Sequence, residues 1–238
     1  KKNVTGDNIK TEIGKWTFGG KVSNTFDNHI KKSIPLYEWC HEIGVNLSDF
    51  FLKDNSACYD VGCSTGTFIK KLSDRNKKKK KIKFYGIDEV HPMIKKAKKK
   101  CKNNKDIVFL NKNFLNLNFK KSSFISSYFT IAFVEPSKRQ KTFDKFYESL
   151  NWGGALLLFD KVRAPDARFQ DMMSQIYLEY KEDRNFSAKE ILDKSKSLKG
   201  VMEPFSSRAN LQLIKRAGFK DYMTVFKFLC FEGFLAIK

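Results

Sequence analysis

A short apolar segment that runs directly into a turn of small residues most restricts the possible fold. Residues 56–61 have the composition of a buried strand, and Gly62-Cys63-Ser64-Thr65-Gly66 follow at once. Helical spacing then continues over residues 67–72. A strand, a glycine-rich turn and a helix in this order build the first unit of a doubly wound α/β sheet. Gly62 and Gly66 carry no Cβ, so the backbone can pass close to a bound ligand there.

The rest of the chain continues the alternation of strand-like and helix-like patterns. The expected strands cover residues 82–88, 107–110, part of 124–133, 155–159, 223–230 and 234–237. The expected helices cover residues 22–47 with a break at Pro35, then 67–72, 91–101, 141–150, a polar stretch within 164–201, and 208–217. This order predicts an α/β fold, a doubly wound, Rossmann-like, mostly parallel sheet with a C-terminal antiparallel hairpin.

Turn signals and one division of the chain complete the expected architecture. Residues 151–154 are expected to form a turn, Gly218 to end the last helix, and Glu232-Gly233 to form the turn of the terminal hairpin. We expect residues 1–50 to form an N-terminal helical arm or lid, and residues 51–238 to form one globular domain.

An acidic residue ends the second strand of the predicted sheet. Asp88 lies about 26 residues after Gly62, where a carboxylate can accept hydrogen bonds from both hydroxyls of a ribose. The turn lacks the third glycine of the dinucleotide pattern and the lysine of a P-loop, which disfavours NAD and ATP. From these residues alone, a plain α/β turn with an exposed aspartate stays the alternative.

The formal net charge of +20 has two interpretations. A basic surface attracts nucleic-acid phosphates through counterion release. Arginine, however, occurs at only seven positions, and lysine, asparagine, isoleucine and phenylalanine are abundant together, as codon bias in an AT-rich genome produces. A dedicated phosphate-binding surface more often uses the bidentate arginine side chain. Compositional bias is therefore favoured, and a nucleic-acid surface stays open.

The cysteines and the apolar runs restrict the compartment and the partners. Five cysteines is an odd number, and they are scattered without a C-x-x-C pair, which argues against a disulfide framework and against a zinc site. We therefore expect a reducing, cytoplasmic location and no metal. No apolar run reaches the roughly 18 residues that span a bilayer, so we expect no membrane partner.

Several sequence stretches resemble a known family. The loop from Asp60 to Gly66, followed by Gly86-Ile87-Asp88, resembles the cofactor loop and ribose carboxylate of class I S-adenosylmethionine (SAM)-dependent methyltransferases. Over nearly the whole chain, the sequence is similar to carboxy-SAM synthases, which supply wobble-uridine modification of tRNA. The stretches that carry this similarity are Trp16-Thr17-Phe18, Phe26-Asp27, residues 32–37, Gly62-Cys63-Ser64, residues 133–140, residues 150–156 and Ala217-Gly218-Phe219.

The resemblance implies a set of binding residues for SAM, S-adenosylhomocysteine or carboxy-SAM. Tyr37 matches a tyrosine at the sulfonium end, and Asp88 matches the ribose carboxylate. Glu89 stands where the family usually has asparagine, and Asn113-Phe114 stand where an Asp-Ile pair flanks the adenine. The full set of expected cofactor residues is Tyr37, Asp60, Gly62, Cys63, Ser64, Gly66, Asp88, Glu89, Asn113, Phe114 and Tyr128.

Two positions depart from the family pattern. Tyr128 stands where the family places an asparagine near the transferred group, and Ser195 stands where it places the arginine that binds the extra carboxylate of carboxy-SAM. Serine cannot replace a charged, bidentate donor, whose hydrogen bonds are typically worth about 1.5–3 kcal/mol. Lys196 follows directly and is a candidate substrate residue together with Ser195, although neighbouring helical residues point in different directions.

No catalytic side chain is assigned, because a sulfonium is already an excellent leaving group and positioning supplies most of the rate. His29, His41 and His91 are interpreted as surface or helix residues rather than bases, and Cys63 as a small residue against the cofactor.

The expected function is therefore that of a SAM-dependent transferase. Without the family arginine, methyl transfer to a small molecule or to RNA is slightly favoured. True carboxy-SAM synthesis, with prephenate as the carboxyl source, is the close rival. A non-catalytic SAM- or RNA-binding module is the third hypothesis. The family's habit suggests a homodimer.

Overall fold

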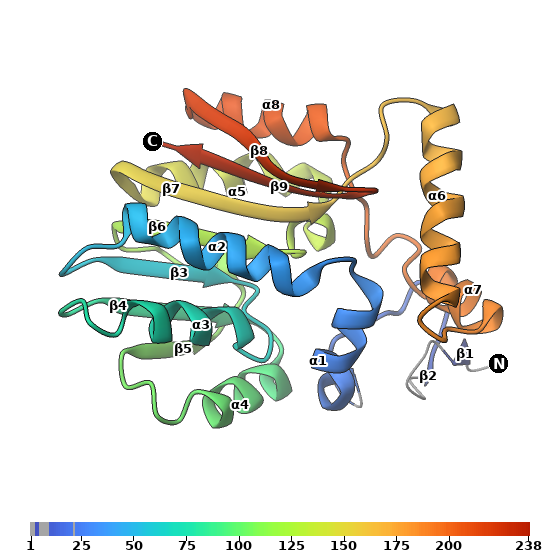
Figure 1. Ribbon diagram of the computed structural model, residues 1–238, viewed down its shortest axis with the longest axis horizontal. Helices are drawn as coiled ribbons and strands as arrows, with labels where there is room; N and C mark the ends of the chain where they lie inside the picture. Colours follow the sequence, from blue (N-terminus) through green and yellow to red (C-terminus); the bar gives the residue numbers. More distant parts are fainter. Residues whose placement is uncertain (1–2, 5–9, 21) are drawn as a thin grey trace.

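The computed structural model describes residues 3–4, 10–20 and 22–238, and its centre is a seven-stranded sheet (Figure 1). The strand order is β5-β4-β3-β6-β7-β9-β8. The first five strands of this order are parallel, and β9 pairs antiparallel with both β7 and β8. The strands are β3 (Ala57–Val61), β4 (Lys83–Asp88), β5 (Ile107–Asn111), β6 (Ser122–Tyr128), β7 (Leu150–Lys161), β8 (Asp221–Phe228) and β9 (Phe231–Ile237). The doubly wound fold and its antiparallel end are confirmed.

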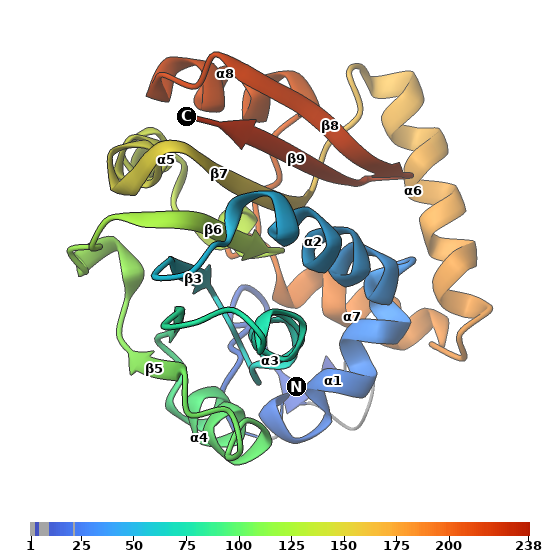
Figure 2. The ribbon, with the colours of Figure 1, turned by 60° about the vertical axis from the view of Figure 1, so that its left-hand side comes forward.

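Helices cover both faces of this sheet (Figure 2). The helices are α1 (Val22–Ser33), α2 (Tyr37–Phe51), α3 (Thr67–Asn76), α4 (His91–Lys100), α5 (Pro136–Ser149), α6 (Ala167–Glu182), α7 (Ala188–Ser197) and α8 (Ser207–Ala217). Two short 3-10 turns, η1 (Phe114–Asn116) and η2 (Ile131–Phe133), and a two-stranded ribbon, β1 (Asn3–Val4) with β2 (Lys10–Thr11), complete the described chain.

The two faces of the sheet build two separate cores because strand side chains alternate in direction. Cys58 packs with residues of α2 and α3, whereas its neighbour Tyr59 packs with residues of α5 and α8. In the same way Leu157 belongs to the first core and Leu158 to the second. This alternation explains why residues 155–159 of β7 are all apolar, since both faces of that strand are covered.

Helices α1, α6 and α7 lie at the end of the sheet toward which the parallel strands run (Figure 1). The ribbon β1–β2 lies beside them, and the parts of the expected arm at residues 1–2, 5–9 and 21 fall outside the described residues. The carboxyl ends of the parallel strands therefore face a second layer of structure rather than open solvent.

Two of the expected turns are wrong. The terminal hairpin turns at Leu229 and Cys230, and Glu232-Gly233 lie within β9. Gly233 serves a close approach instead of a turn, because a Cβ there would lie 2.5 Å from the Phe159 ring. Residues 151–154 belong to an irregular start of β7, where the register with β6 shifts.

Helix α5 begins at Pro136, five residues before the expected start. Proline is favoured in the first turn of a helix, where a missing amide hydrogen costs nothing. The polar stretch of residues 164–201 forms two helices, α6 and α7. Asp166 and Ser187 cap their N-termini with side-chain oxygens.

Candidate active site

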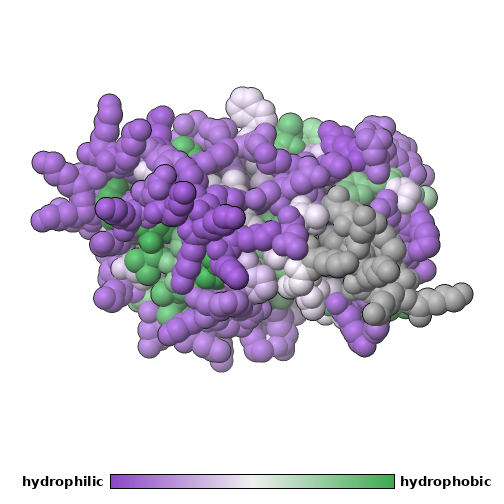
Figure 3. Space-filling view, turned by 90° about the horizontal axis from the view of Figure 1, so that it is seen from below, coloured by the Kyte–Doolittle hydropathy of each residue, from purple (hydrophilic) through white to green (hydrophobic). Residues whose placement is uncertain are grey.

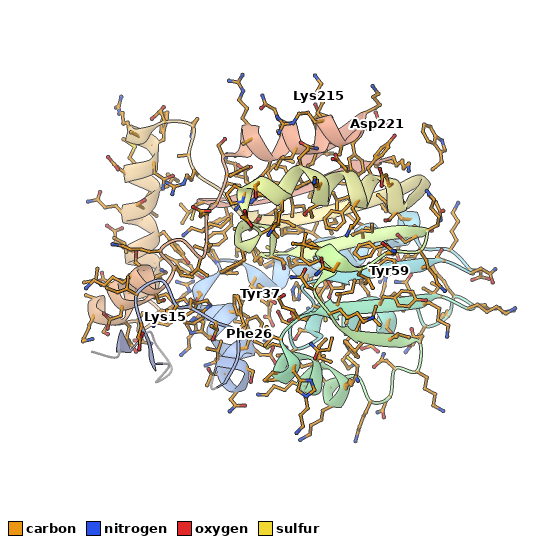
Figure 4. All side chains as sticks on the ribbon, turned by 180° about the vertical axis from the view of Figure 1, so that it is seen from behind. Lys15, Phe26, Tyr37, Tyr59, Lys215 and Asp221 are labelled. Carbon is orange, nitrogen blue, oxygen red and sulfur yellow. The ribbon has the colours of Figure 1, made fainter. Side chains whose placement is uncertain are left out.

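A cavity of about 350 Å³ opens at the carboxyl ends of the parallel strands. Its walls come from the loop after β3, the ends of β4, β6 and β7, the segment around Trp16, and helices α1, α2, α6 and α7. Figure 4 shows Phe26 and Tyr37 between the sheet and the α6–α7 layer, with Lys15 beside α7. Most of the cavity lining is apolar, which suits a small organic ligand rather than bulk solvent.

The loop after β3 forms the floor of this cavity. Gly62 and Ser64 adopt left-handed backbone angles, with φ of 74° and 48°. The amides of Gly62 and Cys63 both donate to the Ile87 carbonyl, at 2.8 and 2.9 Å. A Cβ on Gly62 would lie 2.1 Å from Thr130 Oγ1, so only glycine fits both the angle and the space.

Asp88 joins the loop to the next strand. One carboxylate oxygen accepts from the Ser64 amide and the other from the Val90 amide, both at 2.9 Å. Burial raises the pKa of Asp88, and these two hydrogen bonds oppose that shift. Each carboxylate oxygen can accept more than one hydrogen bond, so Asp88 can hold the loop and still receive ribose hydroxyls.

Glu89 and Asn113 are bound to each other beside Asp88. The Asn113 amide nitrogen donates to Glu89 Oε2 at 2.8 Å, and its carbonyl oxygen accepts from the Leu115 amide, capping η1. Phe114 follows and, like both partners, lines the cavity. Of the three residues at which this chain departs from the family pattern here, Glu89 and Asn113 therefore form one hydrogen-bonded pair.

Two further carboxyl groups are buried at the cavity wall. Burial raises the pKa of Asp60 to about 7, with Asp88 adding to the shift and a hydrogen bond from Ser126 Oγ opposing it. Burial also raises the pKa of Asp160 to about 7, against the opposing effects of the Lys161 amide and the Arg139 guanidinium. Both groups can therefore hold or release a proton near neutral pH.

Aromatic side chains from α2, α3 and the end of β6 form another wall of the cavity. The Tyr37 and His41 rings lie 4.4 Å apart, and the Phe68 and Tyr128 rings 4.3 Å apart. Burial, then nearby lysines, lower the pKa of His41 to about 3, so its ring is neutral. His41 Nε2 is buried with no hydrogen-bond partner among the described residues. The sequence interpretation missed His41 as a cavity residue, although its i,i+4 spacing from Tyr37 places both on one helix face.

Tyr128 also packs inside the protein. Its hydroxyl donates to the Cys40 carbonyl at 3.1 Å, and its ring stacks on Phe159 at 4.8 Å. The hydroxyl occupies the space that the missing side chain of Gly44 leaves, since a Cβ there would lie 2.1 Å away. Tyr128 therefore fills the gap between α2 and β6, and also borders the cavity.

Some of the expected site residues lie away from the cavity. Gly66 caps α3 and packs on Ala97 of α4. Ser195 is exposed on α7, and neither it nor Lys196 lines the cavity. Lys194, one residue earlier, does line it and lies over the Trp16 ring. The remaining expected residues, Tyr37, Asp60, Gly62, Cys63, Ser64, Asp88, Glu89, Asn113, Phe114 and Tyr128, are brought together around the cavity.

A polar cluster that the sequence did not reveal ties α1 to the loop. Asp27 accepts from Thr65 Oγ1 at 2.5 Å and from Lys100 Nζ at 2.7 Å. Lys100 also donates to Thr65 and Thr67. Burial alone would raise the pKa of Asp27, but the hydrogen bonds and charge of Lys100, with Thr65, hold it below its usual range. These residues are far apart in sequence, so no local pattern could indicate their contact.

The residues present fit a SAM molecule. A glycine floor allows close approach, Asp88 retains acceptor capacity for ribose hydroxyls, and an aromatic wall suits a sulfonium cation. The fold and this site define a class I SAM-dependent methyltransferase-type enzyme, and a family model described as a methyltransferase domain matches residues 59–154. The chain belongs to the carboxy-S-adenosyl-L-methionine synthase family.

Full-length relatives carry the family assignment. The chain is 33% identical over 224 residues to carboxy-S-adenosyl-L-methionine synthase of Staphylococcus epidermidis, covering 94% of this chain and 97% of the relative. It is 34% identical over 228 residues to the synthase of Helicobacter pylori, covering 94% and 95%.

Solved structures share the fold at low sequence identity. A putative SAM-dependent methyltransferase from Methanococcus maripaludis superimposes with a TM-score of 0.59 at 17% identity, covering 96% of this chain and 97% of that one. The pyocyanin biosynthetic protein PhzM gives 0.65 at 13%, covering 92% and 58%.

The described residues contain neither a candidate membrane-spanning helix nor a candidate metal site. Among residues 3–4, 10–20 and 22–238, no helix has the length and apolar character needed to cross a membrane. Within the same part of the chain, no three His, Cys, Asp or Glu side chains are grouped as metal ligands.

Proposed function

We propose that this protein synthesises carboxy-SAM from SAM and a small carboxyl donor such as prephenate. The observation that carries the proposal is the single cavity that extends from the Asp88 loop past Asp160 to the lysines of α6 and α7. Lysines line its far end, and their positive charge suits an anionic small molecule. The lysine at position 194 lines this cavity, so a cation is present although Ser195 replaces the family arginine.

The chain's own residues would divide the binding between them. Asp88 would receive the ribose hydroxyls, Asn113 and Phe114 would flank the adenine, and Gly62 to Ser64 would lie under the amino-acid portion. Bound SAM supplies a sulfonium that makes its methyl group both transferable and acidic. Tyr37 would border that end, and Asp160 could hold a proton close by, since burial raises its pKa to about 7.

Ordinary methyl transfer is the second candidate, and the position of Ser195 favours it. This residue is exposed on α7 and cannot bind a carboxylate inside the cavity. A small acceptor fits the cavity better than RNA does, because the segment around Trp16 and helix α7 cover it. The third hypothesis, a non-catalytic SAM- or RNA-binding module, predicts bound nucleoside without turnover.

The test is native mass spectrometry of the purified protein, followed by denaturation and identification of released nucleosides. Carboxy-SAM in the cavity, or its formation from added SAM and prephenate, supports the proposal. SAM or S-adenosylhomocysteine alone, with no carboxy-SAM formed, favours ordinary methyl transfer. A protein that binds none of these molecules overturns every SAM-based function.

We further propose a homodimer that acts in the cytoplasm in support of tRNA wobble-uridine modification. The dimer is supported by α6, which has no buried residue and exposes Phe169, Met172, Ile176 and Leu178. The compartment is supported by five free, buried cysteines. Light scattering tests the dimer.

We also propose contact with RNA and a division of the chain into two parts. RNA contact is supported by the basic charge, and Figure 3 shows mostly hydrophilic side chains over one face. Steep salt dependence of RNA binding would test it. The division into an arm or lid of residues 1–50 and a SAM-binding domain of residues 51–238 is testable by expressing the second part alone.

A further inference from the structure

Two lysines approach one tyrosine ring at the far end of the cavity from Asp88. Lys161 is the last residue of β7, and Lys181 lies one helical turn after Tyr177 on α6. Their ammonium groups lie 4.7 and 4.3 Å from the centre of the Tyr177 ring. All three side chains line the cavity.

The tyrosine between them is fixed in place. Its hydroxyl donates to the Ser33 carbonyl at the end of α1, at 2.7 Å. Its ring packs edge-on against Phe231 of β9 at 5.3 Å. Tyr177 therefore provides a rigid surface that positions both ammonium groups. Because they are already positioned, they lose less conformational entropy when a ligand binds.

These lysines lack the acidic partners that other lysines of the chain have. Lys100 pairs with Asp27 and Lys70 with Asp74, but no carboxylate of the described residues lies within ion-pair distance of Lys161 or Lys181. Burial lowers the pKa of Lys161, and burial with repulsion from Lys161 lowers that of Lys181 to about 8. Two partly buried cations facing one cavity are costly unless an anion joins them.

The place of this pair in the sheet separates it from the ribose end of the cavity. Lys161 ends β7, and Asp88 ends β4, with β3 and β6 between them. Neighbouring strands lie about 4.8 Å apart, so the two strand ends are roughly 14 Å apart. An anion at the lysine pair therefore does not contact the residues assigned to the ribose.

We propose that Lys161, Lys181 and the face of Tyr177 form the subsite for the carboxylate of the second substrate, a small organic acid. The inference rests on the proposed function, since it names the residues that hold the substrate joining SAM in the cavity. This subsite is distinct from the position of the family arginine, which matches Ser195 on α7 and binds the extra carboxylate of carboxy-SAM in the family pattern.

Calorimetric titration of prephenate into protein saturated with S-adenosylhomocysteine tests this subsite. Lys161→Gln and Lys181→Gln should each weaken prephenate binding about tenfold or more, because each removes a charged hydrogen-bond donor. Lys181→Arg keeps the charge and should retain most of the affinity. Lys215→Gln is the matched control, since that lysine is exposed on α8 outside the cavity, and it should change nothing.

Two further measurements, S-adenosylhomocysteine affinity and thermal midpoint, distinguish failure of the subsite from failure of the proposed function. Affinity for S-adenosylhomocysteine should stay within about twofold in both glutamine variants, and the thermal midpoint should not fall, because a repulsive pair has been relieved. Prephenate affinity that is unchanged in both variants, or absent from wild-type protein that binds S-adenosylhomocysteine, overturns the subsite. Weakened S-adenosylhomocysteine binding in the variants also overturns it, by assigning the lysines to the cofactor. Wild-type protein that does not bind S-adenosylhomocysteine overturns the proposed function instead.

Discussion

The Asp88 carboxylate accepts a hydrogen bond from the Ser64 amide, across 24 residues of sequence, at 2.9 Å. The residue that the sequence assigns to ribose binding therefore also holds the cofactor loop in its left-handed conformation. Loop shape and ribose recognition depend on the same side chain, so a change at Asp88 affects both.

Replacing Asp88 by alanine should weaken S-adenosylhomocysteine binding by at least tenfold. The variant loses the acceptors for the Ser64 and Val90 amides as well as for the ribose, and charged hydrogen bonds are worth about 1.5–3 kcal/mol each. Calorimetry measures the affinity. Asp106→Ala is the control, because Asp106 accepts from Ser73 away from the cavity and should affect stability alone. Equal affinities for the Asp88 variant and the wild type would contradict the assignment.

Gly62→Ala should destabilise the protein by more than Gly153→Ala does. Both glycines have a φ of 74°, but a Cβ at Gly62 meets Thr130 and a Cβ at Gly153 meets nothing within 4 Å. The second variant measures backbone strain alone, and the excess of about 1–3 kcal/mol in the first measures overpacking. Chemical denaturation gives both values. Adding Thr130→Ala should recover part of the excess, and equal losses in the two alanine variants would rule out the steric explanation.

Asp60→Asn should remove a pH dependence of stability. Burial raises the folded-state pKa of Asp60 to about 7 from 3.8. The stability contribution of a raised pKa is present below the unfolded pKa and is lost as pH rises through the folded one. Between pH 5 and pH 7 the wild type should therefore lose roughly 2–3 kcal/mol relative to the variant. Urea denaturation at each pH measures this difference.

The control for that experiment is Asp74→Asn. The pKa of Asp74 lies below its usual value, because hydrogen bonds from Lys70 and Asn104 outweigh its burial. Its effect on stability should therefore be constant between pH 5 and pH 7. Parallel curves for wild type and Asp60→Asn would show that Asp60 does not titrate in this range.

Gly44 and Tyr128 should behave as a coupled pair. Gly44→Ala places a Cβ against the Tyr128 hydroxyl and should cost about 1–3 kcal/mol in the wild type. Tyr128→Phe should cost about 1 kcal/mol through the lost bond to Cys40. The alanine should be better tolerated in the phenylalanine background, so a double-mutant cycle should give a coupling of at least about 0.5 kcal/mol. Strict additivity would contradict this packing.

Much of the fold and of the cavity floor was predictable because it is encoded locally. The apolar strand before Gly62, the positive-φ turn and the acid that ends β4 all act within one strand–turn–helix–strand unit. The hairpin turn was wrong for the opposite reason. Gly233 has the composition of a turn, but its role is to admit the Phe159 ring from β7, which only the folded sheet brings near.

The far side of the cavity could not be predicted from the sequence. Lys181 and Lys161 become neighbours only when α6 folds back over the end of β7, and His41 becomes a cavity residue only when α2 packs beside β6. The substrate residues were expected at Ser195 and Lys196 by position in the family pattern. In the structure Lys194, not Ser195 or Lys196, lines the cavity. Neighbouring residues of a helix point in different directions, so a difference of one position decides which side chain reaches the cavity.

The covering of the cavity near Trp16 joins two segments that lie far apart in the sequence. The amides of Gly14 and Trp16 donate to the carbonyls of Lys196 and Ser197, so the arm and the end of α7 are linked through their main chains. Side-chain rotation alone cannot separate them. An opening that keeps these two hydrogen bonds moves both segments together, and a spectroscopic label on either should then report the same rate of ligand exchange.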